Sequence, residues 1–398
     1  MSYFIKGMKM QLGGLKKVIF DYFVYTGITI HLVFFTLYFF APNLLGQVYH
    51  KSQQWIADRG YVISLPASTT SQVVDADIDI DAAFGKWVPL PGQKELYEVA
   101  RIGNIDFSSL KKAASVLKDG ETLEIGEGVY KEPLILTQSN VTIKGIGHVV
   151  IDGVAAMGKA AIINKGNNNR IENIECRNIR VKDRNGACIR HAGKNLTVSH
   201  VYFHDSESGI LTHRNAGITI VENSRFESLG RSGSAHGIYA AGDQLIILKS
   251  LFLAAQDQGH EIKSRTKKTY IKDSVVASLS GKDSRLVDIS NGGELLIENS
   301  ILQQGRASAN QDAIGYGLEG LKHAENSIRL KDNLILLERK NSNVLVHTRG
   351  DKVEPIFDNN IVVSEEAVQM DGFNIRFLNR EEAGLPEYPK LPLSRIDL

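Results

Sequence analysis

An internal repeat constrains the fold of this chain more than any other feature. Between residues 186 and 300, short apolar segments alternate with polar turns and return at intervals of 22 to 27 residues. The second apolar segment of successive copies is aligned at Leu196, Ile218, Leu245, Thr269 and Leu295. A period of this length, with two short apolar runs per copy and no helical pattern, is typical of a solenoid of stacked β coils. The repeat therefore predicts an all-β solenoid.

The turns that follow these apolar segments repeat as well. Examples are Glu222-Asn223-Ser224 and Glu298-Asn299-Ser300. Asn, Asp and Ser suit such corners because they tolerate left-handed backbone angles and form hydrogen bonds to nearby backbone groups. We interpret these polar residues as structural rather than catalytic.

The N-terminal region carries a membrane signal. The 24 residues from Tyr22 to Leu45 contain no Asp, Glu, Lys or Arg. As a helix they would be about 36 Å long, enough to cross a hydrocarbon core of ~30 Å. Lys6, Lys9, Lys16 and Lys17 precede this stretch, which predicts a cytoplasmic N-terminus and an exported body. A cleaved signal peptide is the alternative, and the length of the apolar run disfavours it.

Net charge and cysteine content exclude several classes of protein. The chain has 46 Lys and Arg against 45 Asp and Glu, so its net charge of +1 gives no reason to expect nucleic acid as a partner. Any anion site must therefore be local. The two cysteines, Cys176 and Cys188, are too few for a disulfide scaffold and lack a zinc-ligand spacing. We interpret them as buried free thiols, with pairing in an oxidising compartment as the alternative.

A short helix is expected at the start of the repetitive domain. Asp106 is its predicted N-terminal cap, and Asp119-Gly120 ends it. The apolar residues at helical spacing between these limits are Phe107, Leu110, Ala113, Ala114 and Leu117. A helix at this place would cover the open end of the solenoid, whose first coil otherwise leaves apolar surface and an unpaired strand edge.

The first part of the domain resembles a known family. The helix is followed by Gly120–Tyr130, Val141–Gly145 and Ile151–Gly153, and this order is similar to the opening of right-handed parallel β-helix proteins of the pectate-lyase-like superfamily. The resemblance, which extends over residues 105 to 363, implies an all-β, right-handed, single-stranded parallel β-helix with an N-terminal capping helix, here preceded by one transmembrane helix. The superfamily includes polysaccharide lyases, uronate C5-epimerases, glycoside hydrolases and phage tailspikes, so the resemblance alone does not decide the activity.

The chain is accordingly divided into five parts. A cytoplasmic tail (1–17) and a transmembrane anchor (18–45) precede a linker (46–99), the parallel β-helix domain (100–370) and a C-terminal cap or tail (371–398). The β-helix domain is expected in the periplasm or outside the cell, held to the membrane by its single N-terminal helix.

The strand before each aligned segment is expected to place a row of side chains outside the solenoid. Side chains alternate along a strand, so residues directly after the inward positions point outward. The inward positions are Ile189, Leu211, Ile238, Ile262 and Val287, and the outward ones are Arg190, Thr212, Tyr239, Lys263 and Asp288. Neighbouring coils are about 4.8 Å apart. Tyr239, Lys263 and Asp288 should therefore form one contiguous outward row.

Further polar side chains flank this row. Glu261 precedes Ile262, Arg265 follows Lys263 by two positions, and His213 and Arg214 are expected at the rim of the same face. Six of the eleven histidines fall between residues 191 and 260: His191, His200, His204, His213, His236 and His260. The last two adjoin the row and are expected to turn inward or to lie at a corner.

One long excursion interrupts the later repeats. It runs from Gln303 to Glu325, and Gly315-Tyr316-Gly317 is its predicted return to the stack. Insertions between strands of a rigid scaffold often carry or border a binding site. We expect this one to form a wall of a groove.

The residue types of the outward row suit proton abstraction from an acidic sugar. Removal of the C5 proton of a uronic acid needs a cation that neutralises the carboxylate, a base at C5, and an acid. Arg265, Arg214 or a bound cation would neutralise the carboxylate. Because the neighbouring Asp288 would hold Lys263 protonated, we assign Lys263 to carboxylate binding and Tyr239 or a histidine to proton transfer. The candidate catalytic residues are Lys263, Arg265, Tyr239, His236 and His260.

Two interpretations of this face remain open. In the first, residues of the row and beside it bind substrate; they are Arg190, His213, Arg214, Glu261 and Asp288. In the second, the face is solvated, and its Lys, Arg, Glu and Asp side chains only pair across coils, where such pairs contribute little.

The resemblance narrows the activity. The segments His236–Tyr239 and His260–Arg265 are similar in placement to the active strands of alginate epimerases and of some β-helix lyases. The Asp-Pro-His-Asp signature of the epimerases is absent where Ile238-Tyr239-Ala240-Ala241 stands. The Glu, Lys and Arg of the second segment resemble those of lyases that combine a Lys base, an Arg and calcium, so the resemblance implies Ca²⁺ as a candidate metal, although the sequence shows no clear set of carboxylates for it.

The sequence thus predicts a membrane-anchored β-helix enzyme that acts on an acidic, uronate-containing polysaccharide, as a lyase working by β-elimination. A uronate C5-epimerase is one alternative. The other is a non-catalytic polysaccharide-binding or scaffold component of an exopolysaccharide synthesis or export system, for which a membrane anchor and a cationic face are equally suited.

Overall fold

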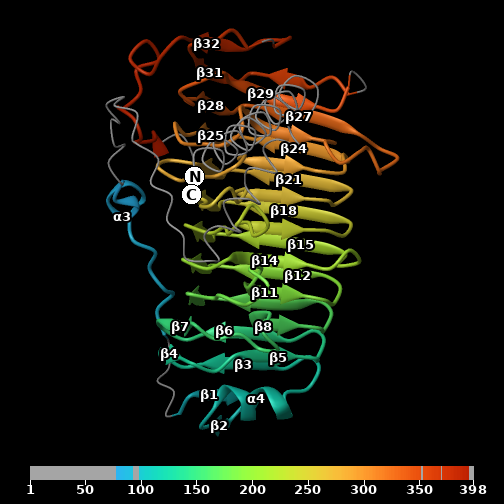
Figure 1. Cartoon of the computed structure of the whole chain (residues 1–398). Helices are drawn as coiled ribbons and strands as arrows, with labels where there is room; N and C mark the ends of the chain where they lie inside the picture. Colours follow the sequence, from blue (N-terminus) through green and yellow to red (C-terminus); the bar gives the residue numbers. More distant parts are fainter. Residues whose placement is uncertain (1–77, 93–97, 351–352, 369, 394–398) are drawn as a thin grey trace, which may run out of the picture. The chain divides into compact units, whose positions relative to one another are not determined.

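Three sheets form the walls of a β solenoid (Figure 1). The computed structural model describes residues 78–92, 98–350, 353–368 and 370–393, all within the unit that spans residues 75–398. Each coil adds one strand to the first, the second and the third sheet in turn, and nine coils of the described residues have all three strands. Corresponding strands of neighbouring coils pair in parallel. The predicted parallel β-helix is confirmed.

The strands are short, and each sheet is named by its place in the coil. The first sheet contains β1 (Ala100–Ile102), β2 (Ile105–Phe107), β3 (Thr122–Ile125), β6 (Thr142–Gly145), β9 (Asn169–Glu172), β12 (Leu196–Ser199), β15 (Ile218–Glu222), β18 (Gln244–Leu248), β21 (Lys268–Lys272), β24 (Glu294–Glu298), β27 (Ser327–Lys331) and β30 (Ile356–Asp358). The second sheet contains β4 (Gly128–Tyr130), β7 (Val149–Asp152), β10 (Glu175–Arg177), β13 (Tyr202–His204), β16 (Arg225–Glu227), β19 (Leu251–Leu253), β22 (Val275–Ala277), β25 (Ile301–Gln304), β28 (Leu334–Leu337), β31 (Ile361–Ser364) and β32 (Ile375–Phe377). The third sheet contains β5 (Leu134–Leu136), β8 (Ala160–Asn164), β11 (Ala187–His191), β14 (Ser208–Thr212), β17 (Ile238–Ala240), β20 (Ile262–Ser264), β23 (Val287–Ile289), β26 (Asp312–Tyr316) and β29 (Val344–Thr348).

Residues at equivalent positions of successive coils stack in the interior. Phe203, Phe226 and Phe252 lie above one another on the second sheet, with ring centroids 5.4 and 4.5 Å apart. All three are buried. Complete burial of one such side chain contributes about 1.5 to 3 kcal/mol. Because the register repeats with each coil, a residue type that fits one coil also fits the next.

The polar corners between the first and second sheets are structural, as predicted. The corner residue has a left-handed backbone in six successive coils, namely Asn223, Lys249, Asp273, Asn299, Asp332 and Asn359. The next residue forms a ladder that runs from coil to coil: the backbone N–H of Ser224 donates to Ser250 Oγ, and that of Ser250 donates to Ser274 Oγ (3.2 and 3.1 Å). These side chains satisfy backbone donors that the turn would otherwise leave unpaired.

The alignment of one coil was predicted wrongly. Leu196 pairs with Thr219 rather than with Ile218, and Thr219 pairs with Leu245. Thr219 is fully buried, whereas Ile218 is 37% exposed. The shift arises because the turn between β14 and β15 is longer than the corresponding turns of the two neighbouring coils. A one-residue change in register moves a side chain to the opposite face of a strand.

The start of the solenoid is covered as expected, but the details differ. Helix α4 (Leu110–Val116) packs on the first coil with Leu110 and Ala113 buried. Its N-cap is Ser109, whose Oγ accepts a hydrogen bond from the Lys112 backbone N–H (3.1 Å), and not Asp106. Asp106 lies in β2, which forms an antiparallel hairpin with β1 that the sequence did not predict. This hairpin pairs with β3 and so satisfies the edge of the first sheet.

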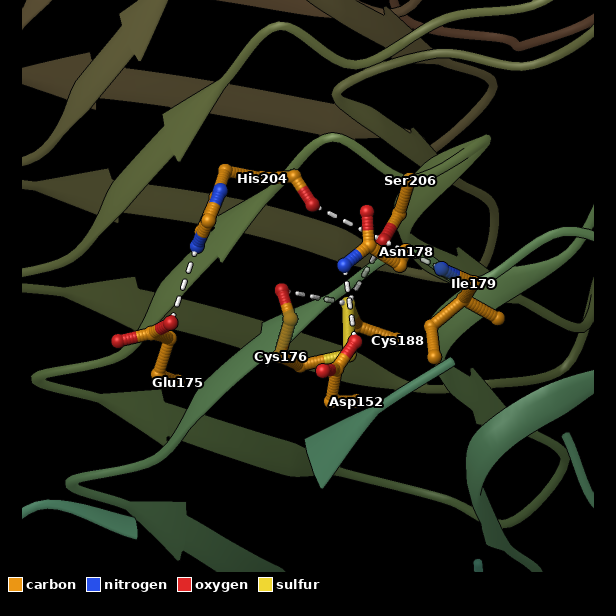
Figure 2. Close-up of a disulfide and its surroundings, with 8 residues drawn as sticks. All are labelled: Asp152, Glu175, Cys176, Asn178, Ile179, Cys188, His204 and Ser206. Atoms are coloured by element: carbon orange, nitrogen blue, oxygen red, sulfur yellow. Dashed lines mark hydrogen bonds and ion pairs between the residues drawn. A yellow bond between two sulfur atoms is a disulfide. The ribbon is translucent and has the colours of Figure 1, made fainter. Parts of the chain in front are cut away.

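Cys176 and Cys188 form a disulfide, so the prediction of free thiols is wrong (Figure 2). Cys176 lies in β10 of the second sheet, and Cys188 lies in β11 of the third sheet of the same coil. Both side chains are completely buried, and their Cα atoms are 5.8 Å apart. The bond forms because two neighbouring walls of one narrow coil bring inward side chains within bonding reach.

Residues 78–92, here called the strap, cross the outer face of the second sheet. They include the short helix α3 (Ile80–Phe84). Arg225 Nη1 donates to the Gly85 carbonyl (2.7 Å), His200 Nε2 donates to the Val88 carbonyl (2.8 Å), and the Leu90 N–H donates to Asn173 Oδ1 (2.8 Å). The strap is thus attached to three coils.

The predicted anchor, residues 18–45, and the predicted cytoplasmic tail, residues 1–17, lie outside the described residues. Within the described part of the chain, no helix has both the length and the apolar character that a bilayer span requires.

Candidate functional site

The outer face of the third sheet carries the predicted row of side chains. Pairing between neighbouring coils aligns Arg190, Leu211, Tyr239, Lys263 and Asp288. In β14, the outward residue is therefore Leu211, and the prediction that it is Thr212 is wrong. The cause is again the longer turn between β14 and β15, which shifts the register of this coil. Thr212 points inward, and its Oγ1 accepts a hydrogen bond from the Ala241 N–H (2.7 Å).

A groove of about 1050 Å³ lies over this face. It extends from the coil of β8 to the turn after β23. Its basic side chains are Lys159, Lys165, Arg190, Lys194, Arg214, Arg265, Lys267 and Lys322, and its acidic one is Asp243. The groove is therefore strongly cationic although the chain as a whole is nearly neutral.

Three of these eight cations form ion pairs with described residues. Lys159 pairs with Asp183, Lys267 with Asp243, and Arg265 with Glu319. The other five form no ion pair with any residue that the structure describes. The Nη1 atom of Arg190 is buried and has no hydrogen-bond partner in the described residues. An uncompensated group of cations favours an anionic ligand.

Tyr239 occupies the middle of the predicted row. Its ring lines the groove, with the Arg265 guanidinium carbon 5.5 Å and the Lys263 Nζ 5.9 Å from the ring centroid. Arg265 also lines the groove, and its Nε is buried without a partner in the described residues. Tyr239 and Arg265 are thus the predicted catalytic residues that reach the groove directly.

Lys263 lies beside them but is largely covered. Its side chain is 13% exposed, and its Nζ donates to Asp288 Oδ2 (2.8 Å) and lies 3.5 Å from Glu319 Oε1. Asp288 is 4% exposed and also accepts a hydrogen bond from Ser290 Oγ (2.8 Å). Burial opposes ionisation of Asp288, but the charge and hydrogen bonds of its neighbours outweigh burial and lower its pKa. Lys263 therefore has an ionised partner beneath it.

His236 and His260 lie beneath Tyr239, in the inward or corner position expected. Their rings stack with centroids 4.9 Å apart, and the backbone N–H of His260 donates to His236 Nδ1 (3.1 Å). The His236 ring meets the Tyr239 ring edge to face at 5.8 Å. Burial, reinforced by nearby cations, lowers the pKa of His236 well below its usual range, and burial lowers the pKa of His260 to about 3 although Asp288 opposes the shift. Both imidazoles are therefore neutral near pH 7 and support Tyr239 from below.

Glu261 does not lie on the outer face, so its predicted placement beside the row is wrong. Its side chain is 1% exposed, and Oε1 accepts a hydrogen bond from the Ala255 N–H (2.6 Å). Burial, followed by the nearby Asp283, raises the pKa of Glu261 well above its usual range. Strand β20 begins at Ile262, so Glu261 precedes the strand. The alternation of inward and outward side chains therefore does not apply to Glu261.

The groove contains cations that the sequence analysis missed. His213 and Arg214 line it as predicted for the rim, but so do Lys165, Lys194 and Lys267. All of these residues lie in turns that lead from the third sheet to the first. A recurrent Lys or Arg in this turn is the sequence signal that identifies them.

The predicted excursion consists of two parts. β26 returns the chain to the stack at Asp312–Tyr316, as expected, and a loop of residues 317–326 then leads to β27. Lys322 and His323 of this loop line the groove, which confirms its predicted role as a wall. The loop also contributes Glu319, for which the sequence held no signal.

The donor set of the groove does not fit calcium. Ca²⁺ takes about six to eight oxygen ligands, with carboxylates prominent among them. The single carboxylate that lines the groove, Asp243, pairs with Lys267 at 2.7 Å. In the described residues, no cluster of three or more His, Cys, Asp or Glu side chains is arranged to hold a metal ion.

The stacked coils and the capping helix define a parallel β-helix, with a groove over one of its three sheets. Among solved structures, an alginate lyase from Paenibacillus sp. str. FPU-7 is similar with a TM-score of 0.50 and 18% identity, over 68% of this chain and 93% of that one. A pectin methylesterase from Yersinia enterocolitica is similar with a TM-score of 0.35 and 13% identity, over 71% and 98%. At these identities the likeness concerns the fold alone. No protein-family model and no curated protein matches the sequence.

Proposed function

We propose that this protein acts on an acidic, uronate-containing polysaccharide and cleaves it by β-elimination. The observation that carries the proposal is the cationic groove over the third sheet, in which eight Lys and Arg side chains face one Asp. Neutral glycans offer no charge to offset such a surface, whereas each residue of a polyuronate carries a carboxylate. The likeness of fold to an alginate lyase is consistent with this substrate class.

The shape of the groove suits a polymer. It crosses the coils from β8 to the turn after β23, and coils are spaced about 4.8 Å apart. Cations recur along this direction in the turns after the third-sheet strands. A chain of sugars lying along the axis would meet a new cation at short intervals, which favours long substrates over single sugars.

The residues near Tyr239 suit the chemistry of elimination. Arg265 and Lys263 would neutralise the uronate carboxylate and so stabilise the carbanion that forms at C5. Tyr239, in its ionised form, would take the C5 proton; the electron pair would form the C4–C5 double bond, the C4–O4 bond would break, and the tyrosine proton would pass to O4. Lys263 is not assigned as the base because it donates to the ionised Asp288. His236 and His260 are assigned to support of the Tyr239 ring.

The test follows the ultraviolet absorbance of the unsaturated product while the full-length protein is mixed with alginate or polygalacturonate. The matched variant is Tyr239→Phe, which removes one hydroxyl and leaves the ring packed on His236. We expect wild type to produce a rise in absorbance and the variant to lose about 10²- to 10⁴-fold in kcat, the usual contribution of a general acid or base. Circular dichroism would verify that both proteins are folded.

Two other outcomes would redirect the proposal. Retention of the polymer without any rise in absorbance would sink the lyase assignment and favour a non-catalytic polysaccharide-binding component. Inversion at C5, detected by NMR in a polymer that keeps its length and gains no double bond, would identify an epimerase that uses the same proton abstraction.

A further inference from the structure

A carboxylate of the protein already occupies the space between the two cations assigned to the substrate. Glu319 Oε1 accepts from Arg265 Nη2 at 2.8 Å, and Oε2 lies 2.7 Å from the same nitrogen. Lys263 Nζ is 3.5 Å from Oε1. The Glu319 side chain is 41% exposed, whereas those of Lys263 and Arg265 are 13% and 26% exposed. Glu319 thus lies on the solvent side of both cations.

The backbone that carries Glu319 is firmly attached to the solenoid. The Gly317 N–H donates to the Ile289 carbonyl (2.8 Å), the Glu319 N–H to the Ser290 carbonyl (2.9 Å), and the Lys322 N–H to the Asn291 carbonyl (2.8 Å). Leu321 of the same loop packs against the hydrophobic core. The loop therefore does not need to open, and rotation of the Glu319 side chain alone is enough to uncover the cations.

We propose that Glu319 is an internal competitor for the uronate carboxylate and sets the affinity of the groove for acidic sugars. In the free protein its carboxylate offsets the charges of Lys263 and Arg265, and an incoming uronate carboxylate takes its place. The inference rests on the proposed function, because it names the residue that the substrate displaces at that same site.

Exchange of one carboxylate for another explains how the site discriminates. A uronate restores the charge and hydrogen bonds that Arg265 loses when Glu319 turns away, so the exchange costs little. A neutral sugar restores neither and leaves a poorly exposed cation unpaired, which is unfavourable. The Arg265 Nε, buried and without a partner in the described residues, offers a further donor to a ligand that approaches from the groove.

The test compares Glu319→Gln with the charge-matched variant Asp243→Asn. Both remove one negative charge beside the groove, but Asp243 pairs with Lys267, and both members of that pair are more than half exposed. Binding of alginate and polygalacturonate hexasaccharides would be measured by calorimetry on the full-length proteins, with maltohexaose as the neutral probe. We expect Glu319→Gln to bind one of the acidic hexasaccharides about two- to fivefold tighter than wild type, and Asp243→Asn to gain much less, because water screens an exposed charge.

The outcomes separate this inference from the proposed function. If wild type binds neither acidic hexasaccharide, the proposed function fails, and the inference fails with it. If wild type binds but Glu319→Gln binds equally or more weakly, Glu319 is a ligand contact or a structural partner, and only the inference is overturned. An equal gain in Asp243→Asn would also overturn it, because the effect would then be one of overall charge. A gain for maltohexaose would contradict the assigned discrimination.

Discussion

The outer faces of the second and third sheets are built from similar residues but treat their charges differently. On the second sheet, Arg225 donates to Glu227 and Asp81 (2.8 and 2.9 Å), and Arg177 donates to Glu175 (3.0 Å). On the third sheet and in the turns that leave it, five of the cations that line the groove form no ion pair with the described residues. The first face is covered by the strap, whereas the second borders an open groove of about 1050 Å³.

The histidines of the two faces differ in the same way. His204 lies between Asp205 and Glu175 (2.7 and 3.2 Å), and Figure 2 shows its bond to Glu175. Burial acts to lower the pKa of His204, but these two carboxylates outweigh it and raise that pKa to about 9. For His260, burial outweighs the single nearby carboxylate of Asp288 and lowers the pKa to about 3. A face whose charges are paired internally serves stability, and a face whose cations are left without partners is available to a ligand.

The sharpest test of this comparison is the removal of one arginine from each face. Arg225→Ala should lower the free energy of unfolding by about 3 to 5 kcal/mol, because it leaves Glu227 and the strap without their buried partner. Arg190→Ala should lower it by about 1 kcal/mol or less. Denaturant unfolding would measure both. Equal losses would show that the groove cations are structural, and the comparison would fail.

A smaller effect is expected from pH on the second sheet. Because the folded pKa of His204 is raised, its stabilising contribution is complete below pH of about 6.5 and is lost as the pH rises through about 9. The loss should be at most about 3 kcal/mol, reduced by solvent at the exposed Asp205. Unfolding would be measured from pH 6 to pH 10 for wild type and His204→Gln. A variant that loses stability over this range as steeply as wild type would show that other groups cause the dependence.

The smallest effects concern single cations of the groove. Arg190→Ala and Arg214→Ala should each weaken binding of an acidic hexasaccharide about two- to fivefold. The differences should shrink in 1 M salt, where the screening length is about 3 Å. Lys268→Ala on the first sheet, which removes a cation paired with Glu294 (2.7 Å), is the control and should leave binding unchanged. An equal effect of Lys268→Ala would mean that the groove has no special role.

Features that depend on local chemistry were readable from the sequence. Asn, Asp and Ser recur at the corners because a left-handed residue is needed there, and apolar residues recur at every second position because strands alternate. These two rules were enough to predict the solenoid and to place Tyr239, Lys263 and Arg265 on one face. Helix α4 was predicted from a different local pattern, apolar residues at helical spacing. Its cap was misplaced because the β1–β2 hairpin was not recognised.

Features that depend on the distance between coils were decided only by the tertiary structure. The register of Thr219 and Leu211 follows from hydrogen bonds to the coils on either side, and a longer turn shifts it without any change in the local pattern. The disulfide of Cys176 and Cys188 requires the walls of one coil to converge. Glu319 lies 54 residues from Arg265 in the sequence, and only the packing of its loop on the turn after β23 brings the two together. Local rules thus determine what each segment becomes, whereas contacts between coils determine which charges find a partner.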